Sequence, residues 1–311
     1  MMAACTAKPE TGISVTLYEQ NEKLGKKIYI TGKGRCNLTN ACDTEDLFAA
    51  IMKNAKFLYS AIYTFDNHAT DGLFCRTLGL KMKTERGNRV FPQSDHASDV
   101  IRVLTEELRR KKVRVCLNTK VQEIVSDGTK VTGVLRWDCH DTHQKNQVSR
   151  AFDAVVAACG GVSYPTTGSD GSGFELCKKL GHTVTELRPS LIGMTTAEEY
   201  IPQLQGLSLK NVTFDVKSGK KTLYSEFGEM LFTHQGVSGP LILTASSCIP
   251  DKYMKQELRF EIDLKPALEE EQLDKRLQRD FAENVNRQFK NAPARAGSSK
   301  IDTGADRTVR H

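Results

Sequence analysis

The chain has 311 residues, of which 39% are hydrophobic and 26% are charged, a balance typical of a globular protein rather than a disordered one. No apolar run approaches the ~18 residues that a bilayer-spanning helix requires, and no basic-then-apolar signal segment opens the chain, so we expect a cytoplasmic protein with no membrane partner. The net charge of +6 comes mainly from residues 275–311, which carry nine basic and four acidic side chains, and this location argues against a nucleic-acid partner.

The first residues predict a helix, a turn and a strand. The run MMAACTAKPETG predicts the last turns of a helix that Pro9 and Gly12 end. Residues 13–20 (ISVTLYEQ) alternate between apolar and polar side chains, which is typical of a strand, and this strand ends beside Glu19. An acidic residue at such a strand end accepts hydrogen bonds from ribose hydroxyls in dinucleotide-binding folds, although a solvated glutamate explains the same position.

Two helices are predicted next, over residues 44–63 and 96–112, and Asp95 and Ser98 are candidate caps of the second. Three short strands should follow the second helix, at residues 113–117, 120–125 and 130–137.

The run DAVVAACGG, residues 153–161, is apolar throughout and ends in two glycines. Such a run predicts a central parallel strand that is buried on both faces. A glycine-rich loop and a helix over residues 173–182 should follow, with Gly181 as the helix stop.

The second half of the chain predicts an antiparallel β module. Short alternating runs occupy residues 209–219, 220–231 and 256–264, and a helix over 238–249 should begin at a Ser-Gly-Pro start. We therefore divide the chain into a first domain at 1–190, a β-rich domain at 191–265, the start of a helical region at 266–292, and a disordered tail at 293–311.

The nine cysteines are odd in number and form no CxxC pair, which favours reduced thiols over a disulfide framework or a zinc ribbon. Cys139, His140 and His143 resemble metal ligands, but they lie in a polar hairpin with no fourth ligand nearby, so we expect no metal site.

The run ITGKGRCNLTN, residues 30–40, has the residue types of a nucleotide-binding loop. Its glycines permit positive φ and close approach of the backbone to a ligand. Arg35 is suited to a pyrophosphate, Lys26 or Lys27 adds a point charge, and Asn37 offers a donor and an acceptor to a ring edge. Cys36 is either a redox thiol or, as we favour, a packed inert one, because no partner cysteine lies at motif spacing.

Three motifs in order, LYEQNEKLGKKIYITGKGRCNLTN, RVFPQSDHASDV and DAVVAACGGVSYPTTGSDGSGFELCKKLGH, resemble a family of bacterial and archaeal NAD(P)/FAD-dependent oxidoreductases. The family is aminoacetone-oxidase-like and includes a bile-acid enone reductase. The resemblance runs from Met1 to Ala292. It implies an α/β fold of the two-dinucleotide-binding-domain flavoprotein type, a Rossmann-like three-layer domain with an inserted β-rich substrate domain.

The resemblance also implies where the cofactor lies. Glu19 would hold the ribose of FAD, Val121 would meet the adenine through its backbone, and Gly160-Gly161 would close over the cofactor. The set along the FAD would be Lys26, Lys27, Arg35, Cys36 and Asn37.

Two departures from the family stand out. The strand and GxGxxG turn with which the family opens are not found, and after Ala292 the chain changes to a tail of low hydrophobicity. We therefore expect an FAD-dependent oxidoreductase that moves a hydride between flavin and a small organic substrate, with NAD(P)H as a possible reductant and direct oxidation by dioxygen equally open. The alternative is a truncated, non-catalytic fragment that cannot hold FAD. The sequence names no substrate and no oligomeric state.

Overall fold

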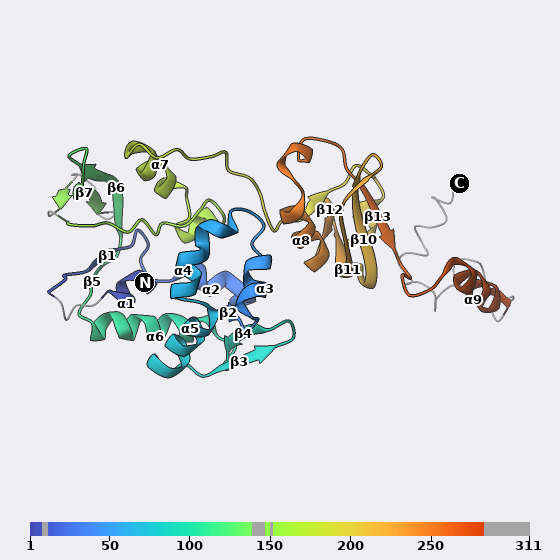
Figure 1. Cartoon of the computed structure of the whole chain (residues 1–311), viewed down its shortest axis with the longest axis horizontal. Helices are drawn as coiled ribbons and strands as arrows, with labels where there is room; N and C mark the ends of the chain where they lie inside the picture. The colour runs from blue at the N-terminus through green and yellow to red at the C-terminus, as the bar shows by residue number, and fades with distance from the viewer. Residues whose placement is uncertain (8–11, 139–146, 150–151, 283–311) are drawn as a thin grey trace. The chain divides into compact units, whose positions relative to one another are not determined.

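The computed structural model describes residues 1–7, 12–138, 147–149 and 152–282, and the chain divides between Glu186 and Leu187 into two compact units (Figure 1). Each unit combines helices with its own sheets. The elements of the first unit are α1 (Met2–Thr6), β1 (Thr16–Tyr18), α2 (Lys26–Ile30), η2 (Thr31–Gly34), β2 (Thr39–Asn40), α3 (Thr44–Ala49), η3 (Ala55–Leu58), α4 (Tyr59–Thr64), α5 (Asn67–Gly72), the π-helical turn η4 (Leu73–Thr77), β3 (Met82–Glu85), β4 (Arg89–Pro92), α6 (Ala97–Arg110), β5 (Arg114–Cys116), β6 (Thr119–Ser126), β7 (Val131–Asp138), β8 (Gln147–Ser149), η5 (Pro165–Thr167) and α7 (Ser172–Lys179).

The predicted helix–turn–strand start is confirmed in outline. Helix α1 ends at Thr6, and the predicted stop at Pro9 lies outside the described residues. Strand β1 is shorter than predicted and pairs in parallel with β5, with Leu17 opposite Val115. The connection from β1 to β5 includes α6, as a parallel pair requires a crossover connection.

Helix α6 has the amphipathic pattern that its sequence predicts. Val100, Val103, Leu104 and Leu108 are all at most 3% exposed and belong to one core cluster with residues of α1 and of the segment around Cys36. The packed face therefore comes from the 3.6-residue period of the sequence itself.

The predicted caps of α6 are wrong. The helix begins after His96, whose side chain makes no capping bond, and the Asp95 carboxylate instead binds Arg35 and Lys83. Near the helix start, Ser94 donates to Asp99 over 2.6 Å. Asp95 adopts a positive φ of 60°, and Ser98 lies inside the helix rather than at its cap position.

The predicted helix over residues 44–63 is also broken. The structure has α3, a turn of 3₁₀ helix at η3 and then α4, and Asn54 before η3 has a left-handed φ of 56°. A left-handed residue cannot continue a right-handed helix, so the chain changes direction there.

Two small antiparallel sheets complete the strands of the first unit. One has the order β2-β4-β3 and the other the order β6-β7-β8. The three predicted strands over 113–137 are confirmed as β5, β6 and β7.

The predicted buried strand at residues 153–161 is wrong. The segment has no strand structure, and its side chains are largely exposed, with Val156 exposed by 73%. No main-chain hydrogen bond joins residues 153–160 to another described residue. An apolar run becomes a buried parallel strand only where neighbouring strands offer it partners, and β1 and β5 pair only with each other within the described residues.

The second unit is built on one five-stranded sheet in the order β13-β10-β11-β12-β9 (Figure 1). All of its pairs are antiparallel, as the alternating runs predict. Its elements are β9 (Met194–Thr195), η6 (Ile201–Leu204), β10 (Ser208–Ser218), β11 (Lys221–Thr233), β12 (Gly236–Ser238), α8 (Pro240–Cys248), η7 (Asp251–Tyr253), β13 (Arg259–Asp263) and α9 (Glu270–Ala282).

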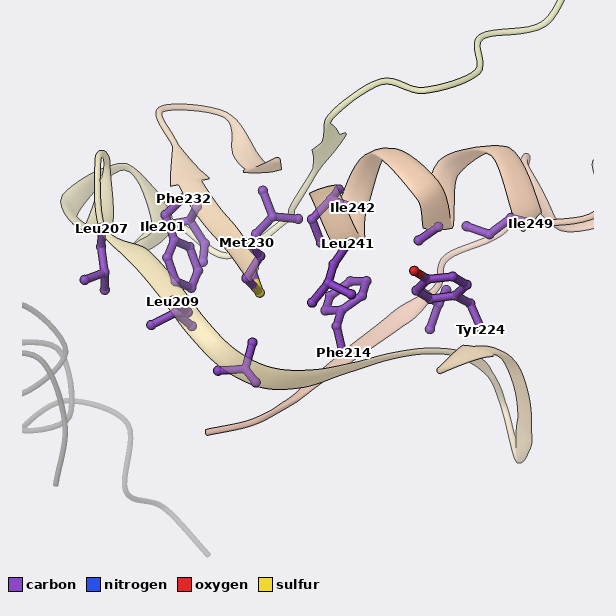
Figure 2. Packing of buried hydrophobic residues seen from close by; sticks show 14 residues of the cluster. Ile201, Leu207, Leu209, Phe214, Tyr224, Met230, Phe232, Leu241, Ile242 and Ile249 are labelled. Atoms are coloured by element: carbon purple, nitrogen blue, oxygen red, sulfur yellow. The ribbon is translucent and has the colours of Figure 1, made fainter. Parts of the chain in front are cut away.

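The core of the second unit lies between the β10–β11 hairpin and helix α8. Figure 2 shows Phe214 of β10 below Leu241 and Ile242 of α8, and Tyr224 of β11 close to the same helix. Phe214 and Ile242 are fully buried. Helix α8 begins at Pro240, as the Ser-Gly-Pro start predicts.

The predicted helix at 266–292 is confirmed over Glu270–Ala282, and its remainder lies outside the described residues. None of the helices in the described ranges is both long and apolar enough to cross a membrane.

Candidate functional site

The end of strand β1 holds Glu19 in a defined position. Its main-chain N–H donates to Cys116 over 2.9 Å, and its carbonyl accepts from Thr119 over 2.9 Å. Its carboxylate Oε1 accepts two further bonds, from the main-chain and the side-chain nitrogens of Asn21, over 2.9 and 2.8 Å. In the described part of the chain Oε2 accepts no bond, so one carboxylate oxygen of Glu19 is available to a ligand.

The two residues after Glu19 connect β1 to the glycine-rich loop 160–171. The Gln20 side chain donates to the Gly168 carbonyl over 2.7 Å, and the Asn21 side chain donates to the Thr167 carbonyl over 3.1 Å. Gly168 has a φ of 97°, which favours glycine, and an added Cβ would lie 2.6 Å from Asn21 Nδ2, so Asn21 would have to shift. These bonds bring segments almost 150 residues apart to one place.

Two predicted lysines lie beside this connection. Lys26 at the start of α2 donates to Asn21 Oδ1 over 3.4 Å and pairs with Glu22 over 3.3 Å. Lys27 donates to the Ser163 carbonyl and, over 3.3 Å, to the Ser163 hydroxyl, and its ammonium lies 5.5 Å from the centre of the Tyr164 ring. Both ammonium groups therefore lie near loop 160–171.

The predicted glycine pair lies in the same loop. Gly160 has a φ of 77°, and an added Cβ would lie 2.8 Å from Ser169 Oγ. At Gly161 an added Cβ would meet no described atom within 4 Å. The backbone at Gly161 is thus open to close approach by a ligand.

An ion pair fixes the far side of the loop. Lys120 on β6 binds Asp170 over 2.8 Å, and Asp170 also accepts from the Ser172 N–H over 3.0 Å. Burial raises the pKa of Asp170, but the Lys120 ammonium and the Ser172 hydrogen bonds outweigh it and hold that pKa below its usual value.

Cys159 belongs to the largely exposed segment 153–161, yet the pKa of its thiol is raised. Desolvation raises its pKa, and the charges of Asp170, Cys177 and Glu19 raise it further. The thiol therefore stays protonated at neutral pH, which argues against a nucleophilic role.

Val121 on β6 packs against the cluster of Ile124, Val134 and Leu176, together with Tyr18 of β1 and Val155. It stands at a register shift between β6 and β7, at Val121 and Glu123. The start of β6 lies beside the end of β1, because the Thr119 N–H donates to the Glu19 carbonyl over 2.9 Å.

The other three predicted residues belong to a different group of contacts. Arg35 binds Glu85 and Asp95, and its guanidinium lies 4.1 Å from the centre of the Phe91 ring. Cys36 is buried, and burial raises the pKa of its thiol. Asn37 is exposed.

The structure thus gathers five predicted residues, Glu19, Lys26, Lys27, Gly160 and Gly161, around the end of β1. It does not place Arg35, Cys36 and Asn37 in that group. Gln20 and Asn21 were not among the predicted residues, because no local pattern shows that their side chains bind the distant residues 167 and 168. The described residues contain no group of three or more His, Cys, Asp or Glu suited to a metal ion.

A family model described as "HI0933-like protein Rossmann domain" matches residues 1–250. Among curated proteins, the 3-dehydro-bile acid delta(4,6)-reductase of Clostridium scindens is 31% identical over 276 residues, which cover 88% of this chain and 63% of that protein. The ribosomal RNA dihydrouridine synthase of Haemophilus influenzae is 28% identical, over 84% of this chain and 61% of that protein. The chain therefore spans a little over three fifths of the length of these relatives.

Solved structures resemble the chain only distantly. An open conformation of a flavocytochrome c3 fumarate reductase matches with a TM-score of 0.43 and 19% identity, over 67% of this chain and 44% of that one. A likeness at this level carries no argument about the site.

Proposed function

The chain belongs to the HI0933-like Rossmann-domain family, an FAD-binding α/β family of flavoprotein oxidoreductases, and from this premise we propose that it serves the reduction of a carbon–carbon double bond conjugated with a carbonyl group. FAD would be the bound cofactor and NAD(P)H the reductant. The observation that carries the proposal is the convergence of an acidic strand end, two lysines and an open glycine loop at one place.

The residues present suit the ribose and phosphate portion of FAD. Glu19 has a free carboxylate oxygen that accepts from ribose hydroxyls, and Lys26 and Lys27 provide positive charge for phosphate. The open backbone at Gly161 admits a ligand where a side chain would obstruct it. Val121 and Gly160, from the bulged β6 and the glycine loop, would border the same ligand, and Cys36 and Asn37 would lie further along it.

The substrate class comes from what the two relatives' names have in common. A delta(4,6) bile acid with a 3-oxo group and a uracil ring both contain a double bond conjugated with a carbonyl. FAD, when bound, supplies the hydride transfer to such a bond. The chain's own part would be to bind and orient: Glu19 would hold the ribose, the two lysines would neutralise the phosphates, and the glycine loop would lie against them.

We propose a small molecule as the substrate, because the reductase relative has the higher identity and matches more of this chain. A uracil base in RNA is the second candidate, which the name of the synthase relative supports. With a small molecule as the substrate, we also propose that the protein acts in the cytoplasm without a membrane or nucleic-acid partner.

The test is to purify the chain and measure FAD binding by quenching of flavin fluorescence, then NAD(P)H oxidation with a steroid enone and, separately, with a uridine-containing RNA. Glu19→Gln should weaken FAD binding roughly fivefold, because a neutral acceptor replaces a charged one. Glu106→Gln, which removes an exposed ion pair with Arg102 on α6, is the matched control and should leave the affinity unchanged.

A chain that takes up no FAD would overturn the proposal in favour of the non-catalytic alternative. If the chain binds FAD but reduces neither substrate, the proposed cofactor would be supported and the proposed substrate class would be refuted.

A further inference from the structure

Four charged side chains form a closed ring of ion pairs in the first unit. Arg35 Nε donates to Asp95 Oδ1 over 2.7 Å, and its Nη2 binds Glu85. Lys83 binds Asp95 Oδ2 over 2.6 Å and Glu85 over 3.5 Å. Each cation thus contacts both anions, and the ring is electrically neutral.

The ring joins three segments that are distant in the sequence. Arg35 follows the glycine turn η2, Lys83 and Glu85 lie on β3, and Asp95 lies between β4 and α6. The guanidinium also stacks on Phe91 of β4, which is 4% exposed. Arg35 is therefore held by carboxylates at its edge and by an aromatic ring at its face.

The turn that Arg35 ends needs such support. Gly32, Lys33, Gly34 and Cys36 all have positive φ, an uncommon conformation for the lysine and the cysteine. The turn's own main-chain bonds include Arg35 N–H to Gly32 and Cys36 N–H to Thr31. An added Cβ on Gly32 would lie 2.8 Å from the Asn37 nitrogen, so the turn is closely folded on itself.

The same contacts reduce what Arg35 offers to a phosphate. Hydrogen bonds from Arg35 lower the pKa of Glu85, and those from Lys83 and Arg35 lower the pKa of Asp95, so both carboxylates are ionised at neutral pH. A phosphate approaching Arg35 would meet two negative charges at contact distance from the guanidinium.

We propose that Arg35 is a positioning residue, whose ion-pair ring clamps the glycine turn onto the β3–β4 hairpin, and that the turn's backbone and Asn37, rather than the guanidinium, face the bound nucleotide. The second half of this statement rests on the proposed function. The first half concerns the protein alone.

Carboxylate variants separate this role from direct phosphate contact. If Arg35 is a clamp, Glu85→Gln and Asp95→Asn should each weaken FAD binding, on the order of threefold to tenfold, in the same direction as Arg35→Gln. If Arg35 binds phosphate, removing either carboxylate frees the guanidinium and should strengthen binding.

A second measurement needs no FAD. The rate at which trypsin cleaves after Lys33 reports how often the turn opens. Glu85→Gln should accelerate this cleavage several-fold, because the variant loses one charge-assisted hydrogen bond that keeps the turn closed. The control is Glu106→Gln, which removes an exposed ion pair with Arg102 on α6 and should leave cleavage at Lys33 unchanged.

Faster cleavage without any FAD binding by the wild-type chain would support the clamp while refuting the proposed function. Unchanged cleavage in Glu85→Gln and Asp95→Asn, or tighter FAD binding by either, would overturn the clamp.

Discussion

The second unit and the region around the end of β1 hold their segments together by different means. In the second unit the β10–β11 ladder runs from Ser208 to Ser218, and β10 also pairs with β13. In the first unit the parallel pair β1–β5 extends over only three residues of each strand. Main-chain ladders organise the second unit, whereas the region around the end of β1 depends on side chains.

The glycine loop 160–171 shows this dependence most clearly. Gln20, Asn21, Lys27 and Lys120 each send a side chain to it. The apolar run just before it, residues 153–160, has no main-chain partner among the described residues. The comparison teaches that apolar composition does not make a strand unless another strand offers hydrogen bonds.

Hydrogen exchange should show the largest difference. Amides in the interior of β10, such as those of Phe214 and Val216, have strand neighbours on both sides. Their exchange should require unfolding of the unit, so they should exchange roughly a thousandfold or more slowly than amides of residues 154–160. Mass spectrometry of exchanged peptides measures both. Slow hydrogen exchange at the amides of residues 154–160 would contradict the difference described between this segment and β10.

Removing core volume from the second unit should have the next largest effect. Ile242→Ala deletes a side chain with no exposed surface and should cost about 2–5 kcal/mol of unfolding free energy. Urea-dependent hydrogen exchange of β10 peptides measures this cost.

Two exposed positions provide controls for the Ile242→Ala variant. Phe227→Ala on β11 and Val156→Ala in the first unit change side chains that are 60% and 73% exposed, and each should change stability by no more than about 0.5 kcal/mol. Because Trp137 is the single tryptophan of the chain, its fluorescence reports unfolding of the first unit during the Val156 experiment. A large cost at Val156 would mean that residues 153–160 are packed in solution.

A glycine pair tests the loop itself. Gly160→Ala should destabilise the first unit by about 1–2 kcal/mol, because its φ is 77° and the new Cβ would press on Ser169. Gly161→Ala should leave the stability nearly unchanged, because nothing described lies within 4 Å of its Cβ. Urea titrations followed by Trp137 fluorescence compare the two. Equal losses of unfolding free energy in the two variants would contradict the contacts described for this loop.

The smallest effect should come from the ion pair between Lys120 and Asp170. The pKa of Asp170 is lowered in the folded chain, so the pair stabilises the fold above the unfolded pKa of about 3.9 and loses its effect as the pH falls through the folded value. Asp170→Asn should therefore cost about 0.5–1 kcal/mol at pH 7, a modest amount for a partly exposed pair, and progressively less below pH ~4. Thermal unfolding at several pH values measures this, and a cost that did not fall in acid would argue against the pair.

Regular elements with a strong period could be predicted from the sequence. The alternating runs became β10, β11 and β13, and the apolar face of α6 packs where its spacing predicts. The domain boundaries stay predictions. The cofactor contacts of Glu19, Val121 and the glycine loop also stay predictions, and FAD titration of variants at these positions tests them.

The predictions that failed depended on distant partners. Asp95 resembles a helix cap in its local sequence, but Arg35, sixty residues earlier, binds its carboxylate. Residues 153–161 resemble a central strand, but a strand also needs neighbours that no local pattern shows.

The amino-acid sequence by itself determined the periods of the strands and helices, the Pro240 start of α8, and the residue types available around the end of β1. Only the tertiary structure decided which of those residues meet. It joined Gln20 and Asn21 to Thr167 and Gly168, and it placed Arg35 between two carboxylates. The physical reason is range: backbone preferences act over a few neighbouring residues, whereas ion pairs and buried contacts form wherever folding brings complementary groups together.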